Sequence, residues 1–162
     1  MPLLRLHRTN YAYDLFVCNS LVDNPLTLSL SDLQDRTRFR TITIPVTLVC
    51  AGNRRKEQNE VHKSLGFSWG AAGVSTALWT GVYLADVLAA ACPSAQEDQE
   101  KGEWKRPKFV VFEGIEDLPD GKYGTSQKLS WAMRKDRGMM LAWAMNGQVC
   151  FTVTSLSFFD KN

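Results

Sequence analysis

The sequence of 162 residues is 44% hydrophobic and 22% charged, with a net charge of +2. This composition is ordinary for one globular domain, so it excludes a disordered chain. The small net charge gives no indication of nucleic-acid binding. No apolar run approaches the roughly 20 residues of a membrane span. Residues 1–8 are too short and too charged for a secretory signal.

The hydrophobic pattern predicts the first elements in chain order. Residues 26–30 alternate as a strand does, and Ser31 with Gln34 predicts the capping box of a short helix. Residues 42–50 form a second, β-prone strand. Residues 83–92 are predicted to form a helix with one face toward the core. The apolar residues on that face are Leu84, Val87, Leu88 and Ala91.

The second half of the chain predicts more strands. Residues 93–107 have no apolar period, so we expect an exposed loop there. Residues 109–112 and 139–145 are predicted strands, and Asn146-Gly147 after the second of them is a strong hairpin signal. No internal repeat or second domain is visible. The order of short helices and strands indicates an α+β fold.

The cysteines are scattered along the chain and include no CxxC pair. This spacing argues against a zinc site, and nothing in it indicates an oxidising compartment, so we expect reduced thiols in the cytoplasm. The four positions are Cys18, Cys50, Cys92 and Cys150.

One of these cysteines stands at the end of a predicted strand, in the run Cys50-Ala51-Gly52-Asn53-Arg54-Arg55. Gly52 and Asn53 both tolerate left-handed backbone and predict a tight turn. Cations near a thiol favour the thiolate, which is the form that binds metal. An arginine guanidinium group suits a planar oxyanion, because two parallel N–H donors meet two oxygens. The run therefore predicts a metal ligand beside an anion pocket. The alternatives are a small buried cysteine and a solvated charge run.

This run and several that follow it resemble the sulfite oxidase family of molybdenum enzymes, in its eukaryotic assimilatory nitrate reductase branch. Residues 56–59 (Lys-Glu-Gln-Asn) and 67–69 (Phe-Ser-Trp) are similar to the nitrate reductase branch rather than to sulfite oxidases. The similar motifs, in order, are residues 49–59, 66–76, 78–82, 84–88, 111–119, 122–126 and 141–147.

The resemblance implies roles for particular residues. Cys50 matches the cysteine that binds molybdenum through sulfur, beside the pterin dithiolene. Arg55 matches an arginine that holds the substrate oxyanion, and Trp69 matches an aromatic wall of the same pocket, with a core aromatic as the alternative. Asp117, with Glu116 as the other candidate, falls where the family places a carboxylate against the pterin; a plain turn residue is the alternative.

The resemblance also implies a fold and an activity. We expect a partial α+β molybdopterin-binding domain of the sulfite oxidase type over residues 14–148, with mixed sheets and short helices, followed by an unrelated tail over 149–162. The implied cofactor is molybdenum-molybdopterin, and the implied reaction is oxygen-atom transfer from nitrate to give nitrite, in the cytoplasm. Alternatives are sulfite oxidation, with a mitochondrial location, and a non-catalytic remnant that binds no cofactor.

Several segments that the family carries are not found in these 162 residues. Upstream we find no Phe-x-Arg-Asn-His segment, and downstream neither a His-Gly-Phe-Pro-Val-Arg nor a Gly-Gly-x-x-Val-Lys-Trp segment. The haem and FAD domains of nitrate reductases are absent too, as is the dimerisation domain of this homodimeric family. We therefore expect a truncated copy whose isolated chain does not hold the cofactor, is marginally stable and aggregates.

Overall fold

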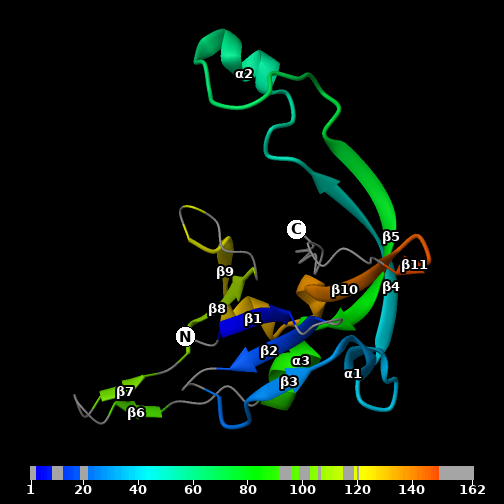
Figure 1. Ribbon diagram of the computed structural model, residues 1–162, viewed down its shortest axis with the longest axis vertical. Helices are drawn as coiled ribbons and strands as arrows, with labels where there is room; N and C mark the ends of the chain where they lie inside the picture. The colour runs from blue at the N-terminus through cyan, green and yellow to red at the C-terminus, as the bar shows by residue number, and fades with distance from the viewer. Residues whose placement is uncertain are drawn as a thin grey trace.

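The chain folds into two larger sheets joined by short helices (Figure 1). The computed structural model describes the backbone of residues 3–8, 13–18, 22–91, 96–98, 103–105, 107–114, 119 and 121–149, and the side chains of 22–91, 107–114, 119 and 121–149. In chain order the elements are β1 (Leu3–Arg8), β2 (Tyr13–Cys18), β3 (Leu26–Leu28), α1 (Leu30–Gln34), β4 (Thr41–Val49), α2 (Arg55–Val61), β5 (Val74–Tyr83), α3 (Leu84–Ala91), β6 (Gln96–Asp98), β7 (Glu103–Lys105), β8 (Phe109–Glu113), β9 (Gly124–Lys128), α4 (Leu129–Ala132), the 3-10 helix η1 (Lys135–Arg137), β10 (Met140–Met145) and β11 (Gln148–Val149).

The sheets mix the two strand directions. One has the order β3-β2-β1-β8-β9, and in it β1 pairs with β8 in parallel while the other neighbours are antiparallel. The other sheet, β11-β10-β5-β4, is antiparallel throughout. A separate hairpin joins β6 and β7. The expected α+β fold with mixed sheets and short helices is confirmed.

Helix α3 supplies one side of the main core. It follows β5 directly, and the four residues predicted for its apolar face are all buried. They pack in one cluster with Val82 of β5, Val110 of β8 and Leu141 of β10, so the helix connects the two larger sheets. Burying a side chain such as leucine or valine contributes about 1.5–3 kcal/mol, which makes this cluster the main source of stability.

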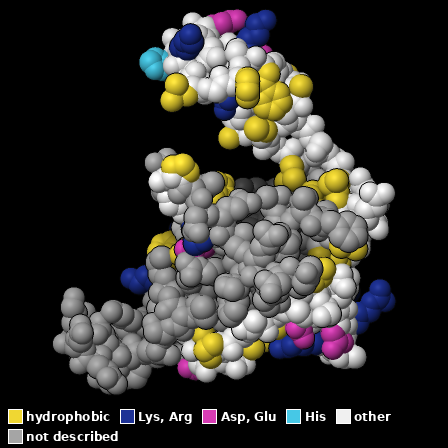
Figure 2. All heavy atoms as spheres, viewed as in Figure 1, with side chains coloured by type: hydrophobic (Ala, Val, Ile, Leu, Met, Phe, Trp, Pro, Cys, Tyr) yellow, Lys and Arg dark blue, Asp and Glu magenta, His cyan; other side chains and the backbone are white. Residues whose placement is uncertain are grey.

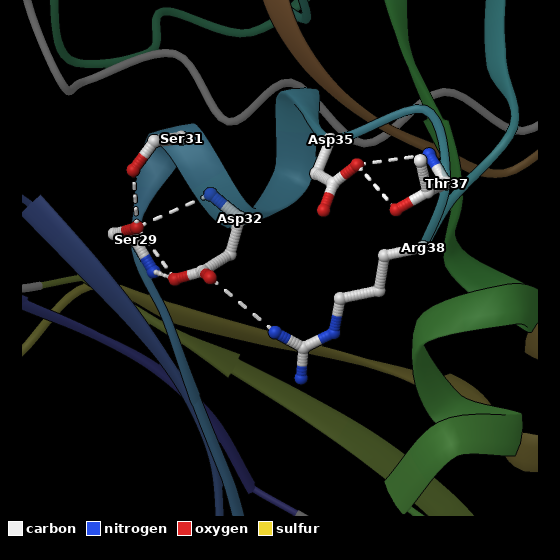
Figure 3. A network of polar contacts seen from close by, with 6 residues as sticks. All are labelled: Ser29, Ser31, Asp32, Asp35, Thr37 and Arg38. Carbon is white, nitrogen blue, oxygen red and sulfur yellow. Dashed lines mark hydrogen bonds and ion pairs between the residues drawn. The ribbon is translucent and has the colours of Figure 1, made fainter.

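Helix α1 begins with a polar network rather than with the predicted cap (Figure 3). The N-cap is Ser29, whose hydroxyl accepts from the Asp32 amide at 3.2 Å, while the Asp32 carboxylate accepts from the Ser29 amide at 2.8 Å. The prediction of Ser31 as the cap is therefore wrong by two positions. The strand before it ends at Leu28, and Asp32 takes the reciprocal place that Gln34 was expected to take.

Of two other predicted segments, the loop over residues 93–107 is partly wrong and the hairpin at residues 146–147 is confirmed. The exposed loop expected over residues 93–107 contains the antiparallel pair β6 and β7, so that prediction is wrong over 96–98 and 103–105. Backbone hydrogen bonds form this pair, and they leave no apolar period in the sequence. The hairpin at Asn146-Gly147 is confirmed: both residues have positive φ, 51° and 79°, and β10 pairs with β11 across them.

Strands β4 and β5 form a long hairpin that carries α2 away from the core (Figure 1). Near its base, alternate residues of β4 pack on a second, small cluster of Trp79, Met140 and Ala142. Farther out the side chains lose this cover, and Val49 is 65% exposed. We call the outer part, residues 47–76, the arm. Within the described residues no helix is long and apolar enough to cross a membrane.

Candidate active site

Cys50 lies where strand β4 ends and the arm turns. Its amide donates to the Gly73 carbonyl at 2.7 Å, which extends the β4–β5 pairing by one residue. Its thiol is free and exposed, and the Sγ atom accepts a hydrogen bond from the Gly52 amide at 3.4 Å. The alternative of a small buried cysteine is therefore wrong. The sulfur is therefore open to a ligand that approaches the end of the strand.

The chain reverses direction directly after Cys50. The Asn53 amide donates to the Cys50 carbonyl at 2.8 Å, which closes a four-residue turn. The left-handed residue is Arg54, with φ of 63°, and neither Gly52 nor Asn53 has positive φ. The predicted tight turn is confirmed, although neither of the two residues that tolerate left-handed backbone adopts it. Gly52 is needed for a different reason, its contact with Arg55.

Helix α2 starts at this turn without a side-chain cap. The first amides of a helix have no partner inside the helix. Here the returning loop supplies the missing carbonyls: the Arg54 amide donates to Gly70 at 3.1 Å, and the Lys56 amide donates to Trp69 at 3.0 Å. These two bonds bring the loop that carries Trp69 back to the cysteine turn.

Arg55 is held by the backbone around it. Its Nη1 donates to the Phe67 carbonyl at 3.3 Å, and the residue is half-buried. A methyl group built on Gly52 would lie 2.8 Å from Nη2, and one built on Gly66 would lie 2.5 Å from Nη1. The guanidinium therefore fills space between two glycines, and a larger residue at either position would displace it.

The neighbouring Arg54 behaves differently. It is exposed, and its Nε forms an ion pair with Glu57 at 2.9 Å. Arg55 is half-buried and donates to a backbone carbonyl instead. The solvated charge run therefore describes Arg54 and Glu57 but not Arg55.

Trp69 lies between the cysteine turn and the start of β5 at Val74. A methyl group on Gly52 would lie 3.2 Å from its Nε1, and one on Gly73 would lie 2.9 Å from its Cη2 and 3.1 Å from the Cys50 Cβ. Trp69 is half-buried and belongs to neither core cluster. The alternative of a core aromatic is therefore wrong.

The structure thus gathers three of the predicted site residues, Cys50, Arg55 and Trp69, around the backbone of Gly52 and Gly73. The fourth, Asp117, and its alternative Glu116 lie outside the described residues. Sequence reasoning also missed two participants, Asn53 and Gly73. The Asn53 Oδ1 accepts from the Gly73 amide at 3.2 Å. The spacing between the two gave no sign of this contact, because it depends on the register of β4 and β5.

The side chains near Cys50 offer few ligands for a metal ion. Among the described residues, no three His, Cys, Asp or Glu side chains gather as a metal centre. A metal at Cys50 would receive one soft donor, the thiol sulfur, from this part of the chain. The described part of the chain thus places an exposed thiol, a half-buried guanidinium and a half-buried indole at one turn.

Comparison with known proteins identifies the family of the chain. Residues 4–150 match the family described as the oxidoreductase molybdopterin binding domain. The chain therefore belongs to the oxidoreductase molybdopterin-binding domain family, and membership implies a molybdopterin cofactor.

Among the curated relatives of the chain are several nitrate reductases. The nitrate reductase [NADPH] of Mycosarcoma maydis is 53% identical over 135 residues, which is 80% of this chain and 14% of that protein. The Neurospora crassa enzyme is 53% identical over 133 residues, 82% of this chain and 13% of that protein. The Phytophthora infestans enzyme is 45% identical over 148 residues, 91% of this chain and 15% of that protein. The chain thus closely resembles one part of nitrate reductases.

A solved structure supports the fold. The sulfane dehydrogenase SoxCD from Paracoccus pantotrophus superposes with a TM-score of 0.59 at 23% identity, over 88% of this chain and 31% of that chain. At this identity the similarity concerns the fold alone.

Proposed function

We propose that this chain supplies the molybdenum ligand and the substrate-facing residues of an oxidoreductase that reduces nitrate to nitrite. The observation that carries the proposal is the placement of Cys50, Arg55 and Trp69 around one turn. The resemblance to nitrate reductases supports the choice of nitrate. Sulfite oxidation and a remnant without activity are the alternatives. Asp117 or Glu116 against the pterin, and a cytoplasmic location, stay predictions.

In this proposal each residue has a separate task. The cofactor, when bound, supplies the metal chemistry that removes one oxygen atom from nitrate. Cys50 ties the metal to the protein through its sulfur. The Arg55 fork binds two oxygens of the planar anion through parallel N–H donors, and the charged hydrogen bonds contribute about 1.5–3 kcal/mol. Trp69 covers one side of the anion and keeps water from it.

The geometry fits such a cofactor in two respects. The Cys50 sulfur is exposed at the end of a strand, so a ligand can approach it without a change in the core. The Arg55 guanidinium is already oriented by the Phe67 carbonyl and by two glycines. An anion that binds there does not have to order the side chain first, and this preorganisation favours binding.

The test uses a graft, because the chain matches only 13% of the Neurospora crassa enzyme. In that enzyme the matching 133 residues are replaced by those of this chain, and we call the product the grafted enzyme. We expect nitrate-dependent oxidation of reduced viologen, and its loss in Cys50→Ser, where hard oxygen replaces soft sulfur. Cys18→Ser is the matched control and should keep turnover.

Three outcomes would contradict the proposal. Turnover unchanged by Cys50→Ser would remove the cysteine from the metal, and loss in Cys18→Ser would move the ligand elsewhere. Oxidation of sulfite without reduction of nitrate would favour the alternative activity. A folded grafted enzyme without molybdenum would favour the remnant.

A further inference from the structure

We propose that Asn53 is the positioning residue of Cys50: its side chain replaces a backbone acceptor of the strand pairing and so fixes where the sulfur points. This inference rests on the proposed role of Cys50 as the metal ligand. It comes from the hydrogen bonds at the outer end of the β4–β5 hairpin.

The first step is the hydrogen bonding between Cys50 and Gly73 at the end of the strand pairing. The last antiparallel pair of the ladder is Val49 with Val74, so Cys50 stands opposite Gly73. The Cys50 amide donates to the Gly73 carbonyl at 2.7 Å. In a regular ladder two such residues exchange both bonds, and the Gly73 amide would donate to the Cys50 carbonyl.

Here the Cys50 carbonyl accepts from the Asn53 amide instead, at 2.8 Å, and so closes the turn. The Gly73 amide would be left without an acceptor, which is costly for a partly buried group. Instead, the Gly73 amide donates to the Oδ1 atom of Asn53, at 3.2 Å. One residue thus closes the turn with its backbone and completes the strand pairing with its side chain.

The consequence concerns the sulfur. The same turn presents the Gly52 amide to the Cys50 Sγ at 3.4 Å. Gly73 is also packed closely, because a methyl group on it would lie 3.1 Å from the Cys50 Cβ and 3.4 Å from the Asn53 Cβ. If Asn53 releases Gly73, the bond from the Cys50 amide to the Gly73 carbonyl alone holds the end of the pairing, and the turn is held less firmly. The direction of the thiol is then less well fixed.

A matched control lies in the same arm. The Asn59 Oδ1 accepts from the Ser64 amide at 2.9 Å and from its hydroxyl at 2.9 Å. This bond is also between an asparagine side chain and a backbone amide, but it closes the far end of α2. Asn59→Leu therefore removes a comparable contact without touching the cysteine turn.

The experiment uses the grafted enzyme, purified without cofactor. Hydrogen exchange at the Gly73 amide and maleimide labelling of Cys50 are both followed by mass spectrometry of the peptides that contain them. Asn53→Leu should accelerate exchange at Gly73 by about tenfold or more, because the amide loses its acceptor. It should also accelerate labelling of Cys50 by about threefold or more, because the turn opens. Asn53→Asp keeps an acceptor oxygen and should restore both rates, and Asn59→Leu should change neither.

The proposal fails if Asn53→Leu leaves Gly73 exchange unchanged, or accelerates exchange without a change in Cys50 labelling. In the second case Asn53 holds the loop but not the sulfur. If Asn53→Leu unfolds the chain, Asn53→Ala is the smaller change and is judged by the same two rates. Neither readout uses molybdenum, so failure of Asn53 as a positioning residue and failure of Cys50 as a metal ligand are seen in different experiments.

Discussion

At the scale of single residues, the site depends on glycines as much as on charged side chains. Gly52 and Gly66 leave the space that the Arg55 guanidinium fills, and Gly73 leaves the space between Cys50 and Trp69. The required feature at these positions is the missing Cβ atom, because a methyl group would come within about 3 Å of a neighbour. The orientation of Arg55 is therefore set by the backbone.

The fork of Arg55 gives the first prediction. Arg55→Lys keeps the charge but loses the parallel donors, so in the grafted enzyme KM for nitrate should rise by roughly tenfold or more with a smaller change in kcat. Steady-state kinetics at fixed viologen concentration measure this. An unchanged KM would mean that Arg55 is a structural charge without contact to the anion.

Gly52 gives a second prediction with a close control. In Gly52→Ala the new methyl group would lie 2.8 Å from Arg55 Nη2 and 3.2 Å from Trp69 Nε1, so both side chains must move. We expect KM for nitrate to rise although no charge changes. Gly70→Ala adds the same methyl group on the same arm with nothing within 4 Å, and it should behave as wild type. Equal kinetics in the two variants would contradict the close packing of Arg55.

At the scale of elements, the polar network at α1 couples stability to pH. The hydrogen bond from the Ser29 side chain lowers the pKa of Asp32, and the Ser29 backbone amide and Arg38 act in the same direction. Because the folded pKa lies below the unfolded one, the stabilisation is present above about pH 4 and is lost as pH falls through the folded value. The carboxylate is half exposed, so its contribution is reduced by solvent screening.

Asp32→Asn tests this network. At pH 7 we expect the variant to be less stable by about 0.3–1 kcal/mol, since it loses the charge that the cap and Arg38 favour. The difference should shrink as the pH falls below about 4, because the wild-type carboxyl is then protonated too. Urea unfolding between pH 7 and pH 3 measures it, with the exposed Glu60→Gln as control. A difference that does not depend on pH would contradict the assignment.

The elements also show what sequence can and cannot predict. Helix α3 and the turn at Asn146 were predictable because their signals are local: apolar residues at helical spacing and a dipeptide suited to positive φ. The closeness of Cys50 and Arg55 was predictable for the same reason. The β6–β7 pair was not, because strand pairing through the backbone leaves no pattern in polar side chains. The bond from Asn53 to Gly73 depends on register, which no local signal gives.

At the scale of the whole molecule, the arm exposes apolar side chains (Figure 2). Val61, Leu65 and Phe67 are 91%, 96% and 90% exposed and lie in or just after α2. Apolar patches of this kind favour association. The main core, in contrast, lies at α3 between the two larger sheets. Among the described residues, the candidate site is therefore built on a part of the molecule with little packing around it.

The exposed arm predicts self-association of the isolated chain. Leu65→Gln together with Phe67→Gln removes the two largest apolar side chains of the patch while keeping the Phe67 carbonyl that Arg55 contacts. We expect this double variant to sediment as a smaller species than wild type at equal concentration. Tyr123→Gln is the control, since Tyr123 is 73% exposed and lies outside the arm. A wild-type chain that stays monomeric at all concentrations would contradict the prediction.

The exposure of Cys50 also affects how firmly the cofactor is held. The open position of Cys50 on the arm predicts weak retention of molybdenum-molybdopterin by the isolated chain. We expect the grafted enzyme to contain molybdenum and the isolated chain to contain much less, as measured by elemental analysis of the purified proteins. Near-stoichiometric molybdenum in the isolated chain would show that the prediction is wrong.

The central claim is that the Cys50 sulfur binds the metal. X-ray absorption at the molybdenum edge of the grafted enzyme counts the sulfur neighbours of the metal directly. We predict that wild type has one more sulfur neighbour than Cys50→Ser, and that the pterin content of the two is the same. An equal number of sulfur neighbours in two proteins with equal molybdenum content would contradict the account.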